Sequence, residues 1–230
     1  MLKAKIISSG GTAAESQGLT TNRYKGMMGI SISNHYFSNE RVMGIVQLGR
    51  ELCSEFVIVI FDYPERWNWP LKQNVGQEEN EKRCLVIGIE KKSAYTRELK
   101  KLNIEKEVQI LTWQDILDHP AYKRNLAALY EEFSNDRGFH SSLITQMETN
   151  LSVRLENGSL SKADILTMSN YLLEEIAGLF YLQFDMNYQL DLYPKAQMQI
   201  VQDIYDDKYP SLSQKMGYDW SKQGWIEVGY

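Results

Sequence analysis

The sequence contains little cysteine and histidine, with 2 Cys and 3 His among its 230 residues. Two cysteines cannot build a framework of several disulfide bonds, and neither lies at a Cys-x-x-Cys or Cys/His spacing typical of zinc ligands. We therefore expect Cys53 and Cys84 to be small core residues of a protein in a reducing compartment, with no bound metal. A glycine-rich phosphate-binding loop of the GxGxxG or GxxxxGK[ST] kind is also missing, and we expect no cofactor.

Long hydrophobic runs are absent as well. No stretch approaches the roughly 18 apolar residues of a membrane span. The apolar run at the N-terminus is too short for a signal peptide, because Lys3 and Lys5 interrupt it. The expected location is the cytoplasm, with no membrane partner. Since no linker rich in Pro, Ser or Gly divides the chain, we expect one domain over residues 1–230. We favour a monomer, although the sequence does not determine the oligomeric state.

Charge is unevenly distributed along the chain. The net charge is −5, yet residues 82–106 carry eight basic and three acidic side chains, leaving 17 basic and 27 acidic residues elsewhere. At roughly 100° per residue, five of these basic side chains share one stripe of a helix. Such a stripe is either a solvated outer helix face or a ridge that follows the phosphates of an RNA. The stripe consists of Lys82, Arg83, Arg97, Lys100 and Lys101.

Apolar runs rich in β-branched residues alternate with helical patterns in the first half of the chain. This alternation predicts an α/β protein with a doubly wound parallel sheet flanked by helices, followed by a helix-rich C-terminal half. The expected strands are 27–33, 55–62 and 108–113, a weaker one at 3–7 and a last one at 224–230. The expected helices are 40–53, 77–102, 113–133 with a break at Pro120, 139–155, 162–181 and 196–205. The stretch PERWNWP at 64–70 is expected to pack over the sheet, with nucleotide stacking by Trp67 and Trp69 as the alternative.

The most informative segment for chemistry is residues 29–38, GISISNHYFS. It lies at the carboxyl end of a predicted strand, where open α/β sheets place their sites. Ser31 is there either a nucleophile or a strand-end serine that caps the following turn or helix. The segment is not the nucleophile elbow of hydrolases, because the GxSxG pattern requires a glycine where Ser33 stands.

A second segment, residues 170–180 with the sequence NYLLEEIAGLF, is predicted to be helical. Tyr171 and Glu175 are four residues apart, so a helix places both side chains on one face. A phenol and a carboxylate in this arrangement could hold the ammonium group of a substrate. The alternative is an ordinary helix surface that carries Glu174 and Glu175.

Together with a third segment, Leu192-Tyr193-Pro194, these stretches resemble the cyclodipeptide synthases. The run GISISNHYFS, followed by a helix and the strand FVIVIFD, is similar to the family's strand–Ser–x–x–Asn–x–Tyr–Phe–Ser signature. The Tyr171 segment resembles the family's Tyr-x-x-x-Glu helix, and Tyr193 stands about where the family has another active-site tyrosine. The similarity spans residues 27–194, and the order and spacing of the three segments agree with the family.

The resemblance implies a Rossmann-like catalytic fold similar to that of class I aminoacyl-tRNA synthetases, and aminoacyl-tRNAs as substrates. The chain lacks the HIGH and KMSKS signatures of those synthetases, which fits an enzyme that receives an already activated ester. The implied activity is that of an aminoacyltransferase. Ser31 takes an aminoacyl group from a first charged tRNA, a second aminoacyl-tRNA reacts with this intermediate, and the dipeptidyl-enzyme cyclises to release a diketopiperazine.

The resemblance also implies roles for particular residues. Glu175 and Tyr171 are expected to hold the amino group, Tyr193 to assist proton transfer, and Asn34 to position the backbone or the serine. A substrate pocket is expected at Met27, Gly29 and Gly178, and the basic stripe corresponds to the family's tRNA-contacting helix. Two features disagree about the subgroup, because Asn34 is typical of one and Pro194 of the other. Two other hypotheses remain: a serine hydrolase that uses Ser31, and a noncatalytic tRNA/RNA-binding module with a Rossmann-like fold.

Overall fold

A computed structural model of the chain describes residues 2–11, 24–72, 75–152 and 160–230. Its strands are β1 (Lys5–Gly10), β2 (Lys25–Ser31), β3 (Glu55–Phe61), β4 (Val108–Thr112), β5 (Leu190–Tyr193) and β6 (Gly224–Gly229). Its α-helices are α2 (Asn39–Leu52), α3 (Gln77–Lys101), α4 (Gln114–Leu117), α5 (Pro120–Asn135), α6 (Arg137–Ser152), α7 (Lys162–Phe180), α8 (Gln199–Tyr205) and α9 (Pro210–Met216). Three further helical turns are η1 (Tyr63–Leu71), η2 (Tyr181–Asp185) and η3 (Trp220–Lys222).

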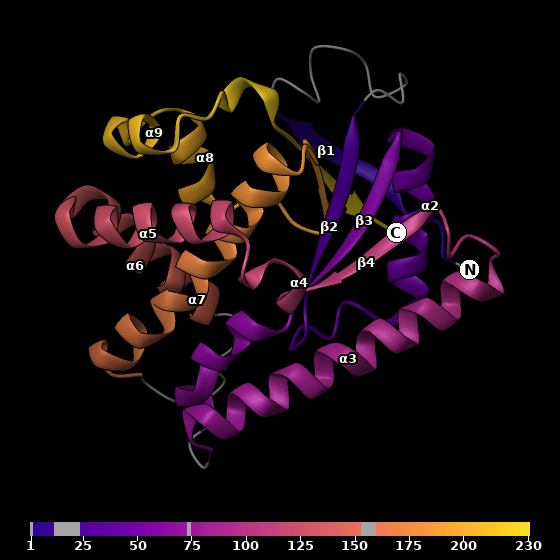
Figure 1. Cartoon of the computed structure of the whole chain (residues 1–230), viewed down its shortest axis with the longest axis horizontal. Coiled ribbons are helices and arrows are strands. Elements are labelled where there is room, and N and C mark those ends of the chain that lie inside the picture. The colour runs from indigo at the N-terminus through magenta and orange to yellow at the C-terminus, as the bar shows by residue number, and fades with distance from the viewer. Residues whose placement is uncertain (1, 12–23, 73–74, 153–159) are drawn as a thin grey trace.

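The strands form one sheet in the order β1-β6-β5-β2-β3-β4. Neighbouring strands from β6 to β4 run parallel, as expected for a Rossmann-like sheet. From β2 the chain adds β3 and β4 on one side and then returns to place β5 and β6 on the other (Figure 1). The strand order therefore reverses between β2 and β5, which is where open α/β sheets bind their ligands.

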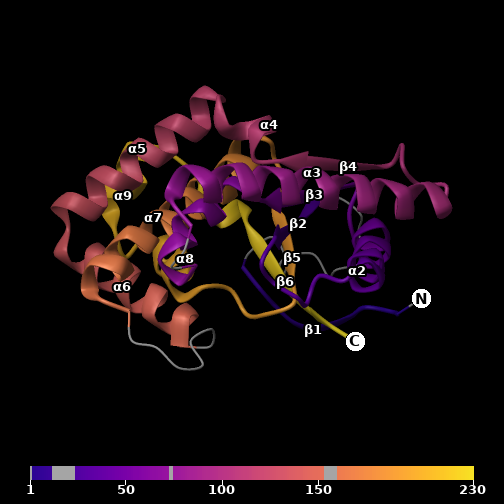
Figure 2. The ribbon, with the colours of Figure 1, turned by 90° about the horizontal axis from the view of Figure 1, so that it is seen from below.

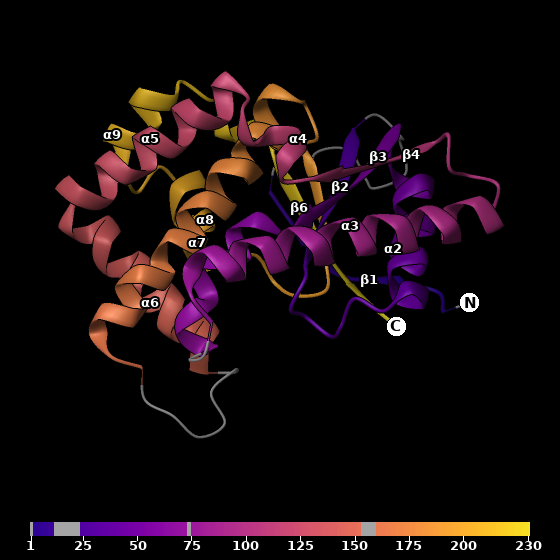
Figure 3. The same ribbon diagram turned by 60° about the horizontal axis from the view of Figure 1, so that its bottom comes forward.

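The sheet separates two apolar cores. Because successive side chains of a strand point to opposite faces, Met27 and Val57 face one core while Met28 and Ile58 face the other. Helices α5 to α9 cover the first face, and α2 and α3 cover the second. Figure 2 shows α5 to α9 gathered at one end of the molecule, and Figure 3 shows α3 running along its length.

The predicted elements agree with the structure in most places. The strands expected at 27–33, 55–62, 108–113 and 224–230 appear as β2, β3, β4 and β6, and the predicted break at Pro120 separates α4 from α5. Two elements were not expected, namely β5 and α9. The weak strand at the N-terminus forms as β1 and runs antiparallel to β6, so the otherwise parallel Rossmann-like sheet is mixed at this edge. The expected end of the helix at 153–155 lies outside the described residues.

Both cysteines are buried in the core, as the sequence predicted. Burial raises the pKa of the Cys53 thiol to about 12 and that of Cys84 to about 11, so neither is a ready nucleophile. Within the described ranges, no helix combines the length and apolarity needed to cross a bilayer. Among the same residues, no group of three or more His, Cys, Asp or Glu side chains is placed to hold a metal ion.

Candidate active site

A pocket opens where β2 and β5 separate. These strands pair only at Gly26 with Leu190 and at Met27 with Asp191, although β2 continues to Ser31. The carboxyl-terminal half of β2 is therefore free of its neighbour on this side, and a pocket of about 630 Å³ forms there. Its walls come from the ends of β2, β3 and β5, from α6 and α7, and from the segment before α8.

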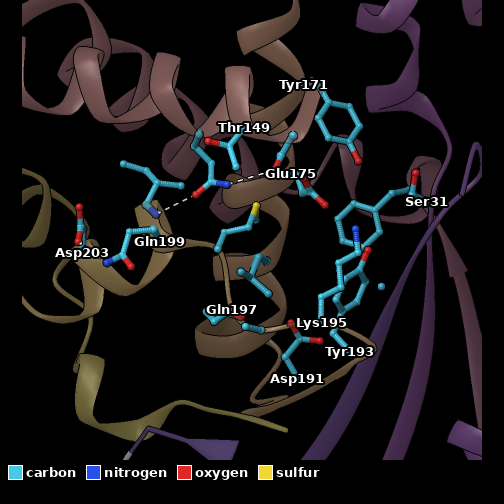
Figure 4. Close-up of a pocket in the computed structure, with 18 of the residues that line it drawn as sticks. Ser31, Thr149, Tyr171, Glu175, Asp191, Tyr193, Lys195, Gln197, Gln199 and Asp203 are labelled. Atoms are coloured by element: carbon cyan, nitrogen blue, oxygen red, sulfur yellow. Dashed lines mark hydrogen bonds between the residues drawn. The ribbon is translucent and has the colours of Figure 1, made fainter. Parts of the chain in front are cut away.

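The pocket brings together residues that are far apart in the sequence (Figure 4). Of the residues expected at the site, it is lined by Ser31, Asn34, Tyr171, Glu175, Tyr193, Met27 and Gly29. The polar wall opposite the sheet comes from α6, where Gln146 connects two elements: its side-chain oxygen accepts a hydrogen bond from the Ile200 amide at 3.4 Å, and its amide donates to Asn150 at 3.1 Å.

Ser31 is the last residue of β2, and its hydroxyl has a buried hydrogen-bond partner. Its Oγ donates to Oε1 of Glu65 at 2.5 Å, and the same carboxylate oxygen accepts a hydrogen bond from the Ser33 hydroxyl at 2.8 Å. Glu65 belongs to η1, which follows directly after β3, so both residues stand at the carboxyl edge of the sheet. Ser31 is 6% exposed and lines the pocket, whereas Glu65 is 1% exposed and does not.

Asn34 shapes the turn after β2. Its backbone amide donates to the Ser31 carbonyl at 3.2 Å, and its side-chain oxygen accepts a hydrogen bond from the Tyr36 amide at 2.9 Å. An asparagine suits this position because its short amide can bond to the backbone two residues on. The turn places Asn34 beside Ser31, and both residues line the pocket.

Helix α7 carries Tyr171 and Glu175. It begins with a capping box, in which Ser161 and Asp164 bond to each other's backbone amides, and it continues through a mostly buried apolar run. Tyr171 is 5% exposed, Glu175 is half-buried, and both side chains reach the pocket from one face of the helix. The structure therefore brings Tyr171 and Glu175 to one pocket.

Gly178 does not line the pocket, so its expected place among the pocket residues was wrong. It lies one turn beyond Glu175, on the side of α7 that packs against Trp113. A Cβ atom at Gly178 would overlap the Trp113 ring. The glycine thus allows close packing of α7 in the core and does not enlarge the substrate site.

Strand β5 contributes Asp191 and Tyr193 to the pocket. The Tyr193 ring packs against Phe37, with centroids 5.8 Å apart, which ties β5 to the turn after β2. Asp191 is partly accessible through the pocket, but the atoms packed around its carboxyl raise the pKa to about 7 through loss of hydration. A carboxyl group with this pKa can lie in the pocket in its neutral form near pH 7.

Comparison with solved structures identifies the fold. The structure resembles a cyclodipeptide synthase (CDPS) from Fluoribacter dumoffii, with a TM-score of 0.75 and 14% identity over 100% of both chains. It also resembles a cyclodipeptide synthase from Bacillus thermoamylovorans, with a TM-score of 0.75 and 17% identity over 96% of this chain and 95% of that one. The chain has the cyclodipeptide synthase fold.

A third structure with this fold is the cyclodipeptide synthase from Candidatus Glomeribacter gigasporarum bound to Phe-tRNAPhe. It matches with a TM-score of 0.64 and 22% identity, over 91% of this chain and 89% of that one. No protein-family model and no curated protein matches the sequence. The similarity is therefore carried by the three-dimensional arrangement much more than by the sequence.

In this cyclodipeptide synthase fold, α3 carries the basic stripe along one outer side. All five stripe residues, Lys82, Arg83, Arg97, Lys100 and Lys101, are exposed. Opposite them, α3 buries Cys84, Tyr95 and Leu99 against the sheet. Two stripe residues form exposed ion pairs within the helix, Lys82 with Glu78 and Lys101 with Glu98, each at 2.7 Å. The segment predicted to pack over the sheet forms η1 and packs against α7 and α3 instead, so this prediction was wrong. The Trp67 indole donates to Glu174 of α7 at 2.9 Å.

Three pocket or near-pocket residues were missed by the sequence interpretation: Glu65, Asp191 and Lys195. Glu65 follows a predicted strand, so its place at the sheet edge could have been expected from the sequence. Asp191 lies in a four-residue strand whose pattern is too short to recognise. Lys195 projects into the pocket from the segment after β5 and places a cation near the tyrosines (Figure 4).

Proposed function

We propose that the chain is a tRNA-dependent cyclodipeptide synthase, an aminoacyltransferase that joins the aminoacyl groups of two aminoacyl-tRNAs into a cyclic dipeptide. One observation carries the proposal: Ser31, Tyr171, Glu175 and Tyr193, which come from three distant segments, line one pocket in a chain with the cyclodipeptide synthase fold.

In the first step the Ser31 hydroxyl attacks the carbonyl carbon of an aminoacyl ester. A bond forms between Oγ and this carbon, the bond from the carbon to the ribose oxygen breaks, and the tRNA leaves with a hydroxyl group. Such covalent catalysis divides one difficult transfer into two easier ones. Glu175 and Tyr171 hold the amino group of the attached residue, because a carboxylate and a phenol oxygen both accept hydrogen bonds from an ammonium group.

In the second step the amino group of the residue on Ser31 attacks the ester of a second aminoacyl-tRNA. The dipeptide stays on Ser31 and the second tRNA leaves. The free amino group of the dipeptide then attacks the Ser31 ester, which releases Oγ with a proton and closes the six-membered ring. Tyr193 lines the same pocket and assists proton transfer, and the turn at Asn34 holds Ser31 in position. The ester bonds of the substrates supply the driving force.

The stripe on α3 binds the tRNA backbone in this proposal. Lys82 and Lys101 are nineteen residues apart, which on a helix is about 28 Å. The N-terminal end of α3 packs on η1, which carries Glu65: the Asn80 amide donates to the backbone carbonyls of Glu65 and Arg66, at 3.3 and 3.0 Å. The stripe therefore starts close to the site and leads away from it, as an elongated polyanion requires.

The test is mass spectrometry of the medium from bacteria that express the chain. We expect a cyclic dipeptide with the parent chain, none with Ser31→Ala and a strongly reduced amount with Glu175→Gln. Ser134→Ala, which changes an exposed serine on α5, is the matched control and should leave the product unchanged. Absence of any cyclic dipeptide with soluble parent protein would contradict the proposal. Conversion of aminoacyl-tRNA to free amino acid by Ser31 would instead support a hydrolase.

A further inference from the structure

We infer that Glu65 is the proton acceptor for Ser31, and that it stores the serine proton while Ser31 carries an acyl group. The inference rests on the proposed function, since it concerns the nucleophile of that reaction. A serine hydroxyl is a weak nucleophile unless a neighbouring group takes its proton. Glu65 provides such a group, because its Oε1 lies 2.5 Å from Ser31 Oγ in a buried contact.

The surroundings of Glu65 fix the orientation of its carboxylate. Oε1 accepts hydrogen bonds from the Ser31 and Ser33 hydroxyls, and Oε2 accepts one from the Asn68 amide at 2.6 Å. Asn68 belongs to the same η1 turn and is itself buried. A carboxylate held on both oxygens cannot turn away from Ser31, which keeps the short contact in place through the reaction.

No cation neutralises Glu65 within the described part of the chain. No Lys, Arg or His nitrogen there lies within 4.0 Å of its carboxylate oxygens. The neighbouring Arg66 turns to Glu174, with which it forms two parallel hydrogen bonds at 2.7 and 2.5 Å. A carboxylate without a cationic partner is free to take a proton from a hydroxyl, whereas one held in an ion pair resists protonation.

Two carboxylates thus flank the nucleophile with different tasks. Glu175 lines the pocket and meets the substrate, whereas Glu65 lies outside the pocket lining and reaches the site through Ser31. Glu65 is too enclosed to bind a substrate ammonium group. Pairs of carboxyl groups in unlike environments commonly divide acid–base work in this way.

The proton can be followed through the cycle. When Oγ bonds to the ester carbon, its proton moves to Glu65 Oε1, and the leaving ribose oxygen takes a proton from the substrate ammonium group held at Glu175. This transfer leaves a neutral amino group on the residue bound to Ser31, and a neutral amine is the form that attacks the second ester. As the new amide bond forms, the amine releases a proton, and the ribose oxygen of the second tRNA takes it. In the closing step the bond from Oγ to the carbonyl carbon breaks, and Oγ takes its proton back from Glu65. The two remaining ammonium protons pass to solvent.

Single-turnover acylation, followed by the mass of the intact chain, tests the inference. Glu65→Gln keeps the size and one oxygen of the side chain but cannot take a proton. We expect acylation to slow by about 10² to 10⁴-fold, with half-saturation by aminoacyl-tRNA unchanged. The exposed Glu51→Gln on α2 is the matched control, and melting temperatures verify folding. Acylation of Glu65→Gln within about threefold of the parent rate would overturn the inference.

Two readouts separate proton transfer from a structural role. The first is the pH–rate profile, whose fall toward acid pH we expect to disappear in Glu65→Gln. Glu65 shares the surroundings of the Cys84 thiol with Asp62, Arg66 and Lys72, and the pocket on the other side of Ser31 is lined by Tyr171, Glu175 and Tyr193. All of these groups remain in the variant. The second is the Ser31→Cys background, where a thiol ionises more readily and should lose much less from Glu65→Gln. Equal losses for serine and thiol with an unchanged profile would overturn the inference.

A second variant covers the case in which Glu65→Gln does not fold. Glu65→Asp keeps the carboxylate but shortens its reach, so we expect slower acylation that retains the fall toward acid pH. Loss of that fall in Glu65→Asp would overturn the inference. The parent chain separates the two proposals: if it acylates while Glu65→Gln acylates equally fast, only the role of Glu65 fails. If the parent chain is not acylated at all, the proposed function is wrong, and so is the inference, because it rests on that function.

Discussion

The Ser31 hydroxyl lies between a buried carboxylate and an open pocket. It donates a hydrogen bond to the buried Glu65 side chain, and it lines the pocket together with Tyr171 and Glu175. A hydroxyl in this place can lose its proton to one side and bond to a substrate on the other. The same residue at a solvent-exposed turn would only cap the following turn or helix, which is the role that spacing alone favours.

Asp191 makes stability depend on pH. The pKa of its carboxyl is raised from 3.8 to about 7 in the folded chain, so between these values the folded chain holds a proton that the unfolded chain loses. The free energy of unfolding therefore falls as pH rises from about 4 to about 7, by up to about 4 kcal/mol. We expect Asp191→Asn to remove this fall, and urea unfolding at pH 4 to 8 measures it.

The exposed Asp207→Asn is the control for Asp191→Asn and should keep the parent's pH dependence. If Asp191→Asn loses stability between pH 4 and 7 as steeply as the parent, burial of Asp191 is not the cause. Cyclic-dipeptide formation should also change in Asp191→Asn, because the side chain lines the pocket.

Gly178→Ala tests the packing of α7 against Trp113. The added methyl group overlaps the indole ring, so we expect a loss of about 1 to 3 kcal/mol in the free energy of unfolding. Gly76→Ala, at an exposed position where a Cβ meets no atom within 4 Å, should change it by less than about 1 kcal/mol. If Gly178→Ala has an unchanged melting temperature and the product contains different amino acids, Gly178 lines the substrate pocket after all.

Among the elements, η1 and α7 depend on each other. Arg66 of η1 and Glu174 of α7 form a buried ion pair at 2.5 Å, and the Arg66 guanidinium stacks on Tyr63 with 3.6 Å to the ring centroid. Since η1 carries Glu65 and α7 carries Tyr171 and Glu175, this pair sets the distance between the two halves of the site. Removal of one partner leaves a buried charge without compensation.

We expect Arg66→Met to lower the free energy of unfolding by about 3 to 5 kcal/mol, measured by urea denaturation. The double variant Arg66→Met/Glu174→Leu removes both charges and should recover at least half of that loss. A double variant no more stable than the single one would show that packing of the Arg66 side chain, and not its charge, holds η1 on α7.

Local sequence patterns predict some helices and strands of this fold and miss others. Strands such as β3, buried on both faces, have continuous apolar runs and were predictable, and so were the long helices α3 and α7 with their periodic faces. Strand β5 was missed because it has four residues, with Asp191 in the middle. The antiparallel direction of β1 depends on its pairing with β6, more than 200 residues away, which no local pattern encodes.

The candidate site could be predicted where the resemblance to a known family adds to the spacing, as at Ser31, Tyr171 and Glu175. Spacing alone favours a capping serine and an ordinary helix surface. The site was not predictable where a role depends on packing. Gly178 was placed in the pocket because its position on α7 suggested free space, but the Trp113 ring occupies that space. The contact of Glu65 with Ser31 bridges 34 residues of sequence, so no local pattern encodes it.

On the scale of the whole molecule, the chain is acidic overall, and α3 carries the basic stripe. The net charge of −5 disfavours nonspecific binding to nucleic acids. Electrostatic attraction of a nucleic acid therefore depends on a local group of basic side chains such as this stripe. Figure 3 shows α3 running along the molecule, and the five stripe residues on it are exposed. The arrangement fits a protein that binds tRNA along one defined line.

We expect Lys100→Glu/Lys101→Glu to weaken the use of aminoacyl-tRNA by at least about tenfold, because phosphate contacts are lost and like charges are introduced. Transfer from a small activated amino-acid ester to Ser31 should remain nearly unchanged. Lys123→Glu/Lys222→Glu alters the charge equally on exposed lysines away from α3 and is the control. If both double variants use aminoacyl-tRNA at the same rate, measured at two salt concentrations, the stripe is only a solvated helix face.

The most direct measurement is the mass of the intact chain, quenched with acid seconds after mixing with one purified aminoacyl-tRNA. We expect a gain of one aminoacyl residue, located on the peptide that contains Ser31 and absent from Ser31→Ala. The added mass should disappear when a second aminoacyl-tRNA is supplied and a cyclic dipeptide forms. The same mass gain on Ser31→Ala, or a cyclic dipeptide formed by that variant, would contradict transfer through Ser31.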